Sequence, residues 1–131
     1  MKTLLGTKLG MTQLLAEDGR AVPVTLIQAG PVTVTQVKTV ETDGYNAVQI
    51  AYGEGKNLSK AVAGHVKSAK VTPKFLREVR VDEPVEAKVG DSFDVSVFAI
   101  GDTVDATGIS KGKGFAGIVK RHNFNKSKKT H

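Results

Sequence analysis

The C-terminal segment, residues 111–131, has the residue types best suited to binding a polyanion. It reads KGKGFAGIVKRHNFNKSKKTH and holds seven of the chain's nineteen Lys and Arg residues, with no Asp or Glu. Phe115, His122 and Phe124 lie between the basic residues and offer surfaces on which bases can stack. This combination favours nucleic-acid binding, whereas a solvated, disordered tail accounts for the charge alone.

Residues 112–117 also match the G-x-G-x-x-G pattern of nucleotide-binding loops. A dinucleotide site needs a preceding strand, a following helix and an acidic residue about 20 positions later, and no acidic residue follows Asp105. The Walker pattern fails because it would require Gly at Thr107 and Ser or Thr at Gly114. We therefore expect these glycines to let the backbone lie close to RNA.

Catalytic chemistry has weak candidates. His65 and His122 are the best general bases, and Asp102 or Asp105 could orient them. No nucleophile or cluster of metal ligands accompanies these residues, and the absence of cysteine excludes thiolate metal sites and disulfides. The sequence predicts a protein that is not an enzyme and has no cofactor or metal.

The 131 residues are most simply one domain. Residues 1–110 contain twelve basic and thirteen acidic side chains, so the positive charge is concentrated in the C-terminal segment. No apolar run reaches membrane-spanning length, and Lys8 with two glycines interrupts any signal-peptide core. We expect a soluble, cytoplasmic protein.

Alternating apolar residues and turn signals predict four strands within residues 10–52. The expected strands are 11–15, 22–29, 32–39 and 46–52, with turns at 16–19, 30–31 and 41–44. In the third strand, Val37 lies out of phase with Val32 and Val34, which indicates a bulge. Short strands at this spacing are typical of a barrel or sandwich.

The pattern becomes helical after Asn57. Leu58, Val62, His65, Val66 and Ala69 recur at helical spacing, and Asn57 or Ser59 is the expected cap. We expect His65 to be structural. The lysines on the opposite side of this helix are expected to be solvated or to make a second nucleic-acid contact. Further strands are predicted at 75–81, 93–97 and 104–109.

The chain also resembles the family of bacterial large-subunit ribosomal protein L-three (L3). Matching motifs follow one another over almost the whole sequence: residues 1–2, 6–12 (GTKLGMT), 31, 34–39 (VTQVKT), 43–45 (DGY), 47–49 (AVQ), 63–65 (AGH), 104–105, 107–108, 110–115 (SKGKGF), 117 and 120–124 (KRHNF).

The resemblance implies a mainly β fold, a translation-factor-type Greek-key antiparallel β-barrel. Residues 1–110 would form the barrel domain, with an α-containing insertion at about 55–90 and a helix near 57–70. Residues 111–131 would be a basic, extended arm that binds ribosomal RNA and begins the family's central loop. Family members continue through this loop to further strands, so the chain is expected to be a fragment or a shortened member, which leaves closure of the barrel open.

The function implied by the resemblance is structural. The protein would bind large-subunit ribosomal RNA, support assembly and lie near the peptidyl-transferase region beside proteins of the L-fourteen and L-nineteen families. The rival interpretation is a free-standing β-barrel that binds RNA nonspecifically through its tail. From the family match we expect RNA contacts by Lys111, Lys113, Lys120, Arg121, His122 and Asn123. The positive charge of the segment adds Lys126, Lys128 and Lys129 as further expected contacts, and Lys2 and Lys8 are weaker candidates. Phe115 and Phe124 would either stack on bases or pack on the barrel.

Overall fold

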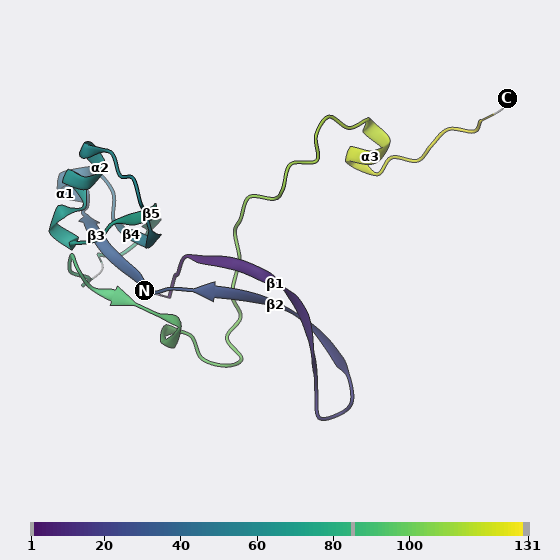
Figure 1. Ribbon diagram of the computed structural model, residues 1–131, viewed down its shortest axis with the longest axis horizontal. Helices are drawn as coiled ribbons and strands as arrows, with labels where there is room; N and C mark the ends of the chain where they lie inside the picture. The colour runs from purple at the N-terminus through teal and green to yellow at the C-terminus, as the bar shows by residue number, and fades with distance from the viewer. Residues whose placement is uncertain (1, 85, 130–131) are drawn as a thin grey trace.

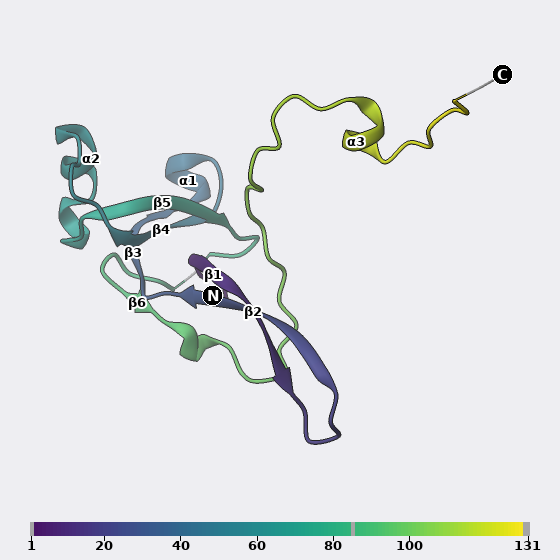
Figure 2. The same ribbon diagram turned by 45° about the vertical axis from the view of Figure 1, so that its right-hand side comes forward.

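The computed structural model describes residues 2–84 and 86–129, which form two antiparallel sheets and a C-terminal arm (Figures 1 and 2). Within these residues, strands β1 (Gly6–Leu15) and β2 (Ala21–Ala29) pair only with each other. The second sheet has the order β5-β4-β3-β6, from β3 (Val32–Lys38), β4 (Ala47–Glu54), β5 (Pro73–Arg80) and β6 (Ser92–Phe93).

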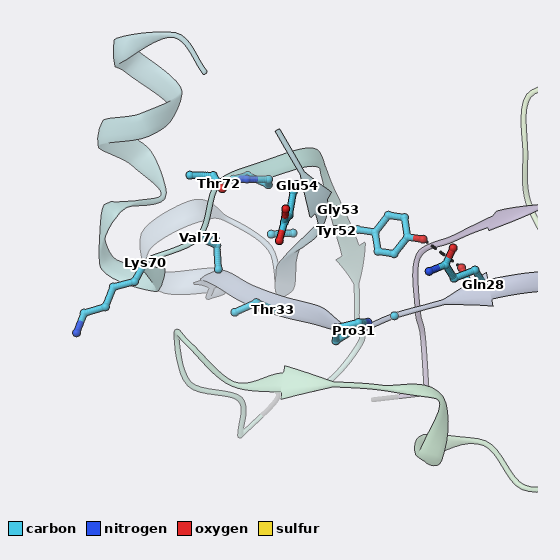
Figure 3. A pocket seen from close by; sticks show the side chains of 12 residues that line it. Gln28, Pro31, Thr33, Tyr52, Gly53, Glu54, Lys70, Val71 and Thr72 are labelled. Atoms are coloured by element: carbon cyan, nitrogen blue, oxygen red, sulfur yellow. Dashed lines mark hydrogen bonds between the residues drawn. The ribbon is translucent and has the colours of Figure 1, made fainter. Parts of the chain in front are cut away.

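Closure of the barrel, which the sequence left open, is not found among the described residues. No strand ladder joins the β1–β2 hairpin to the four-stranded sheet among them, so the edges of both sheets stay open. Tyr52 links the two sheets instead, since its hydroxyl donates to the Gln28 carbonyl at 3.1 Å (Figure 3) and lies 3.3 Å from Thr7 Oγ1. The fold is therefore mainly β and antiparallel, but open.

The bulge predicted in the third strand is confirmed. Val34 pairs with Ile50, and the register then shifts so that Gln36 pairs with Gln49 and Val37 with Val48. The extra residue, Thr35, is buried, and its hydroxyl donates to Gln49 Oε1 at 2.8 Å. One additional residue reverses the alternation of side chains, so Val37 returns to the face that carries Val34.

That face carries the hydrophobic core. Val32, Val34, Val48 and Ile50 are fully buried there. Partly buried residues from the N-terminal segment, the other strands and the following loop pack around them: Leu4, Leu5, Val37, Tyr52, Val79, Ala87 and Phe93. The core thus belongs to the four-stranded sheet and not to the hairpin.

The opposite face carries polar side chains together with the buried Ala47 and Ala51, and the helical insertion partly covers it. α2 (Lys60–His65) and the 3-10 helix η1 (Lys67–Ala69) are shorter than the expected 57–70 helix. Ser59 caps α2 by accepting from the Val62 amide at 3.3 Å, as one of the two predicted caps. Val66 and Ala69 are buried, and His65 Nε2 lies 2.8 Å from Gln49 Oε1, which makes this histidine a structural link to β4.

A hydrogen-bonded cluster lies on the same polar face. Lys38 Nζ contacts Glu78 Oε1 at 2.7 Å, and the Tyr45 hydroxyl accepts from Lys38 and donates to Glu78 at 2.9 Å each. The Lys38 ammonium, followed by the Tyr45 hydroxyl, lowers the pKa of the Glu78 carboxyl, and these bonds raise the pKa of Lys38. Arg80 lies 4.6 Å from the centre of the Tyr45 ring.

The turn expected at 41–44 contains a short helix, α1 (Val40–Asp43), and Gly44 ends it with a φ of 81°.

Two of the predicted strands do not form. In place of a strand at 93–97, the chain forms the two-residue β6 and the 3-10 helix η2 (Val95–Val97). The Asp94 carboxylate accepts from the Ser96 amide at 2.8 Å, a local bond that competes with a strand ladder. Residues 104–109 form no strand, and Ile109 is fully exposed.

Candidate nucleic-acid interface

The predicted RNA-binding residues lie mainly on an arm that projects away from both sheets (Figures 1 and 2). From residue 103 to Gly117 the chain has no helix or strand, and α3 (Ile118–His122) follows. Every described residue from 101 onward is exposed except Ala116, which is half-buried. The basic side chains of the arm are therefore available to a partner.

The short helix α3 interrupts the expected extended conformation. The Gly117 carbonyl accepts from the Lys120 and Arg121 amides at 3.1 and 2.9 Å. Asn123 ends the helix in the left-handed conformation with a φ of 56°, which asparagine tolerates better than most residues. Lys120, Arg121 and His122 occupy the last turn, where positive charge is favoured by the helix dipole.

Four of the predicted basic residues line one concave surface. It has a volume of about 910 Å³ and is formed by residues 110–116 together with Lys120 and Arg121, so that Lys111 and Lys113 face the same hollow. Gly114, with a φ of 70°, helps the backbone to turn there. Sequence reasoning identified these residues but missed the hollow, whose local signals in the sequence are Gly112, Gly114 and Gly117.

The aromatic residues of the arm are accessible. Phe115 is fully exposed and does not pack on the described part of the body. Phe124 is exposed and its ring centre lies 5.8 Å from that of His122, with 37° between the planes. Base stacking requires such free aromatic faces.

The remaining predicted residues are not gathered at this hollow. Lys126, Lys128 and Lys129 follow α3 on the exposed end of the arm. Lys2 pairs with Asp102 at 3.2 Å, and Lys8 is exposed on β1. The lysines of the arm thus form the main group.

The structure does not assemble the rival nucleotide and catalytic sites within the described residues. No strand directly precedes the Gly112–Gly117 pattern, and the helix after it has only five residues. His65 is bonded to Gln49, whereas Asp102 binds Lys2 and the Ala99 amide. The described part of the chain has no group of three or more His, Asp or Glu that could hold a metal.

A hollow of about 540 Å³ lies near Tyr52, between the hairpin and the start of β5 (Figure 3), and none of the predicted RNA-binding residues lines it. Within residues 2–84 and 86–129, no helix has the length and apolar character needed to cross a bilayer.

Comparison with known proteins extends these observations. The family model "Ribosomal protein L3" matches residues 80–131. Over 99% of its length the chain is 50% identical to the large ribosomal subunit protein uL3 of Carboxydothermus hydrogenoformans. This chain belongs to the ribosomal protein L3 family.

Two further members of the L3 family support the assignment. The uL3 proteins of Acidothermus cellulolyticus and Cutibacterium acnes are 52% and 54% identical over 95% and 100% of this chain. The chain spans 64% of the length of the Carboxydothermus hydrogenoformans protein, 57% of the Acidothermus cellulolyticus protein and 60% of the Cutibacterium acnes protein. The resemblance to the L3 family inferred from the sequence motifs is confirmed.

Proposed function

We propose that this chain is a structural constituent of the large ribosomal subunit and binds large-subunit ribosomal RNA through residues 111–131, here called the arm. One observation carries the proposal. The segment matched by the L3 family model, residues 80–131, includes the whole arm, and the basic residues of its described part are exposed. The curated relatives are named as large ribosomal subunit proteins.

The proposed contacts follow from the chemistry of the side chains. The hollow lined by Lys111, Lys113, Lys120 and Arg121 would receive phosphates, with Arg121 able to make a bidentate contact. The lysines at 126, 128 and 129 would extend the phosphate contacts along the RNA. Asn123 and His122 would add hydrogen bonds, and Phe115 and Phe124 would stack on bases. Lys2 and Lys8 would make weaker contacts.

We also propose the division of the chain into a body, residues 1–110 with an insertion at about 55–90, and the arm. The body would be part of a translation-factor-type Greek-key barrel. The hairpin supports this, because Leu9, Met11, Leu14, Leu15 and Leu26 are exposed on it and would be covered by further strands.

In this proposal the protein acts by shape and charge, without catalysis, in the cytoplasm. The arm would reach toward the peptidyl-transferase region and help to organise it during assembly. Proteins of the L-fourteen and L-nineteen families would be neighbours of the body.

The test compares the full chain with a variant in which Lys111, Lys113, Lys120 and Arg121 are all replaced by Gln. Binding to large-subunit ribosomal RNA is measured by filter retention over a range of salt concentrations. Each lost phosphate contact lowers the slope of log affinity against log salt by about 0.7–0.9, so the four substitutions should lower it by about 3. An unchanged slope would contradict the assigned role of the arm.

Cofractionation separates this function from a nonspecific RNA-binding module. The tagged chain should enter large ribosomal subunits and prefer their RNA to an unrelated RNA of equal length. Equal affinity for both RNAs, with no entry into particles, would favour the nonspecific module.

A further inference from the structure

Polar side chains from four separate stretches of the sequence meet in one network on the polar face of the four-stranded sheet. The stretches are 34–39, 43–45, 47–49 and 63–65, all of them motifs by which the chain resembles the L3 family, and the proposed contacts of the arm use none of them. Together with a residue of β5 they form a hydrogen-bonded network of Thr35, Lys38, Tyr45, Gln49, His65 and Glu78. A function of the arm alone leaves this convergence unexplained.

Gln49 of β4 lies at the centre of the network. The bulge in β3 places Thr35 and Gln36 together opposite Gln49, and the Thr35 hydroxyl donates to Gln49 Oε1 at 2.8 Å. On its other side, Gln49 pairs directly with Glu78 of β5. The pKa of the Glu78 carboxyl is lowered mainly by Lys38 and also by a hydrogen bond from the Gln49 side chain. Gln49 therefore joins three strands through one amide group.

These contacts fix the orientation of the Gln49 amide. Its NH2 group must face the Glu78 carboxylate, because an amide oxygen placed there would meet only acceptors. Oε1 is then left to accept from Thr35 and from His65, whose Nε2 lies 2.8 Å away. Since a carboxamide oxygen can only accept, His65 Nε2 must carry the hydrogen. The network thus assigns the Nε2–H tautomer to this histidine.

Little else holds α2 to the sheet. All six residues of α2 are exposed, and within residues 2–84 and 86–129 the bond between His65 and Gln49 is the one hydrogen bond that joins this helix to a strand. Burial begins only after the helix, at Val66 and Ala69. Below the helical segment, the Gly55 amide donates to the Thr72 carbonyl at 2.8 Å and closes the segment off from the β4–β5 ladder. Release of α2 therefore requires no loss of strand pairing.

We propose that this network is a latch, in which Gln49 is the positioning residue that holds α2 against the sheet through His65. When the bond between Gln49 and His65 is broken, α2 opens as a local unit while the core and the strand ladders stay folded. The inference goes beyond the proposed function, since no residue of the arm takes part in the latch. It assigns one common role to the four motifs, which is to keep the helical segment in a single position on the body.

The experiment measures amide hydrogen exchange by NMR in the full chain. The test variant is Gln49→Leu, which keeps the approximate size of the side chain and removes both polar atoms. The matched control is Gln36→Leu, because Gln36 is the same residue type beside the same bulge and has no part in the network. His65→Leu breaks the same bond from the side of the helix, so it decides the question if Gln49→Leu also unfolds the sheet.

The amides of Ala63 and Val66, which are bonded within the α2 turn, report on the latch. In Gln49→Leu and in His65→Leu they should exchange about two- to tenfold faster, the effect of one lost hydrogen bond, while the amides of β3 and β5 keep their rates. The double variant should exchange no faster than either single variant, because both changes remove the same bond. Gln36→Leu should exchange like the wild type.

The ring-nitrogen spectrum of neutral His65 provides an independent readout, since it reports which nitrogen carries the hydrogen. The wild type should have this hydrogen on Nε2. Unchanged exchange of the α2 amides in His65→Leu would overturn the inference, as would additive effects in the double variant or a wild-type hydrogen on Nδ1.

Discussion

The structure makes a quantitative distinction between two isoleucines that both occur in strands. Ile50 of β4 is 0% exposed in the core of the four-stranded sheet, whereas Ile27 of β2 is 52% exposed on the hairpin. Replacing a buried isoleucine by alanine removes transfer free energy and leaves a cavity, at a cost of about 2–5 kcal/mol. Ile27 buries about half of its surface, so Ile27→Ala should cost only about 1 kcal/mol.

The measurement is urea unfolding followed by far-ultraviolet circular dichroism, with the two variants and the wild type at the same protein concentration. A loss for Ile27→Ala as large as that for Ile50→Ala would refute the assignment of the core to one sheet. It would mean that the hairpin is covered in solution, and a dependence of the midpoint on protein concentration would identify the cover as a second copy.

Two further predictions concern local contacts. In Gly55→Ala the new Cβ would lie 2.7 Å from the Pro73 carbonyl oxygen, so the free energy of unfolding should fall by about 1–3 kcal/mol. Gly64 lies in helix α2 and a Cβ added there has no neighbouring atom within 4 Å, so Gly64→Ala should raise the free energy of unfolding by about 0.5–1 kcal/mol. Urea titrations of both variants would reveal any reversal of this order. Glu78 has a lowered pKa, so its stabilising effect is present above the ordinary carboxyl value of 4.5 and is lost as pH falls through the lowered value. Stability of the wild type should therefore decline below about pH 4.5 more steeply than that of Glu78→Gln, and parallel pH profiles would contradict the role of Lys38.

The sequence was sufficient where a local pattern and its tertiary partner agree. Alternation and the turn residues Asp18 and Gly19 predicted the hairpin, although β1 begins at Gly6, earlier than expected. The phase shift at Val37 predicted the bulge because only an extra residue returns that side chain to the core. These elements have their pairing partners nearby in the sequence.

The sequence failed where a partner strand or a local hydrogen bond decided the outcome. Alternation at 93–97 resembled a strand, but the Asp94 carboxylate bonds to the Ser96 amide and turns the chain. Residues 104–109 have no partner among the described strands, so their β-branched residues remain in a coil. In the arm, charge predicted the residues of the candidate site. Their convergence on one hollow depends on the positive φ of Gly114 and on the helical turn that starts after Gly117, which composition does not encode.

Binding of the proposed arm to RNA would carry a large cost in conformational entropy. Fixing one residue costs about 1–2 kcal/mol, so holding the nineteen described residues 111–129 in one conformation on RNA would cost on the order of 20–40 kcal/mol. The turn already formed by α3 lowers this cost. The phosphate contacts and base stacking proposed for the arm would have to exceed the remaining cost for the complex to be stable.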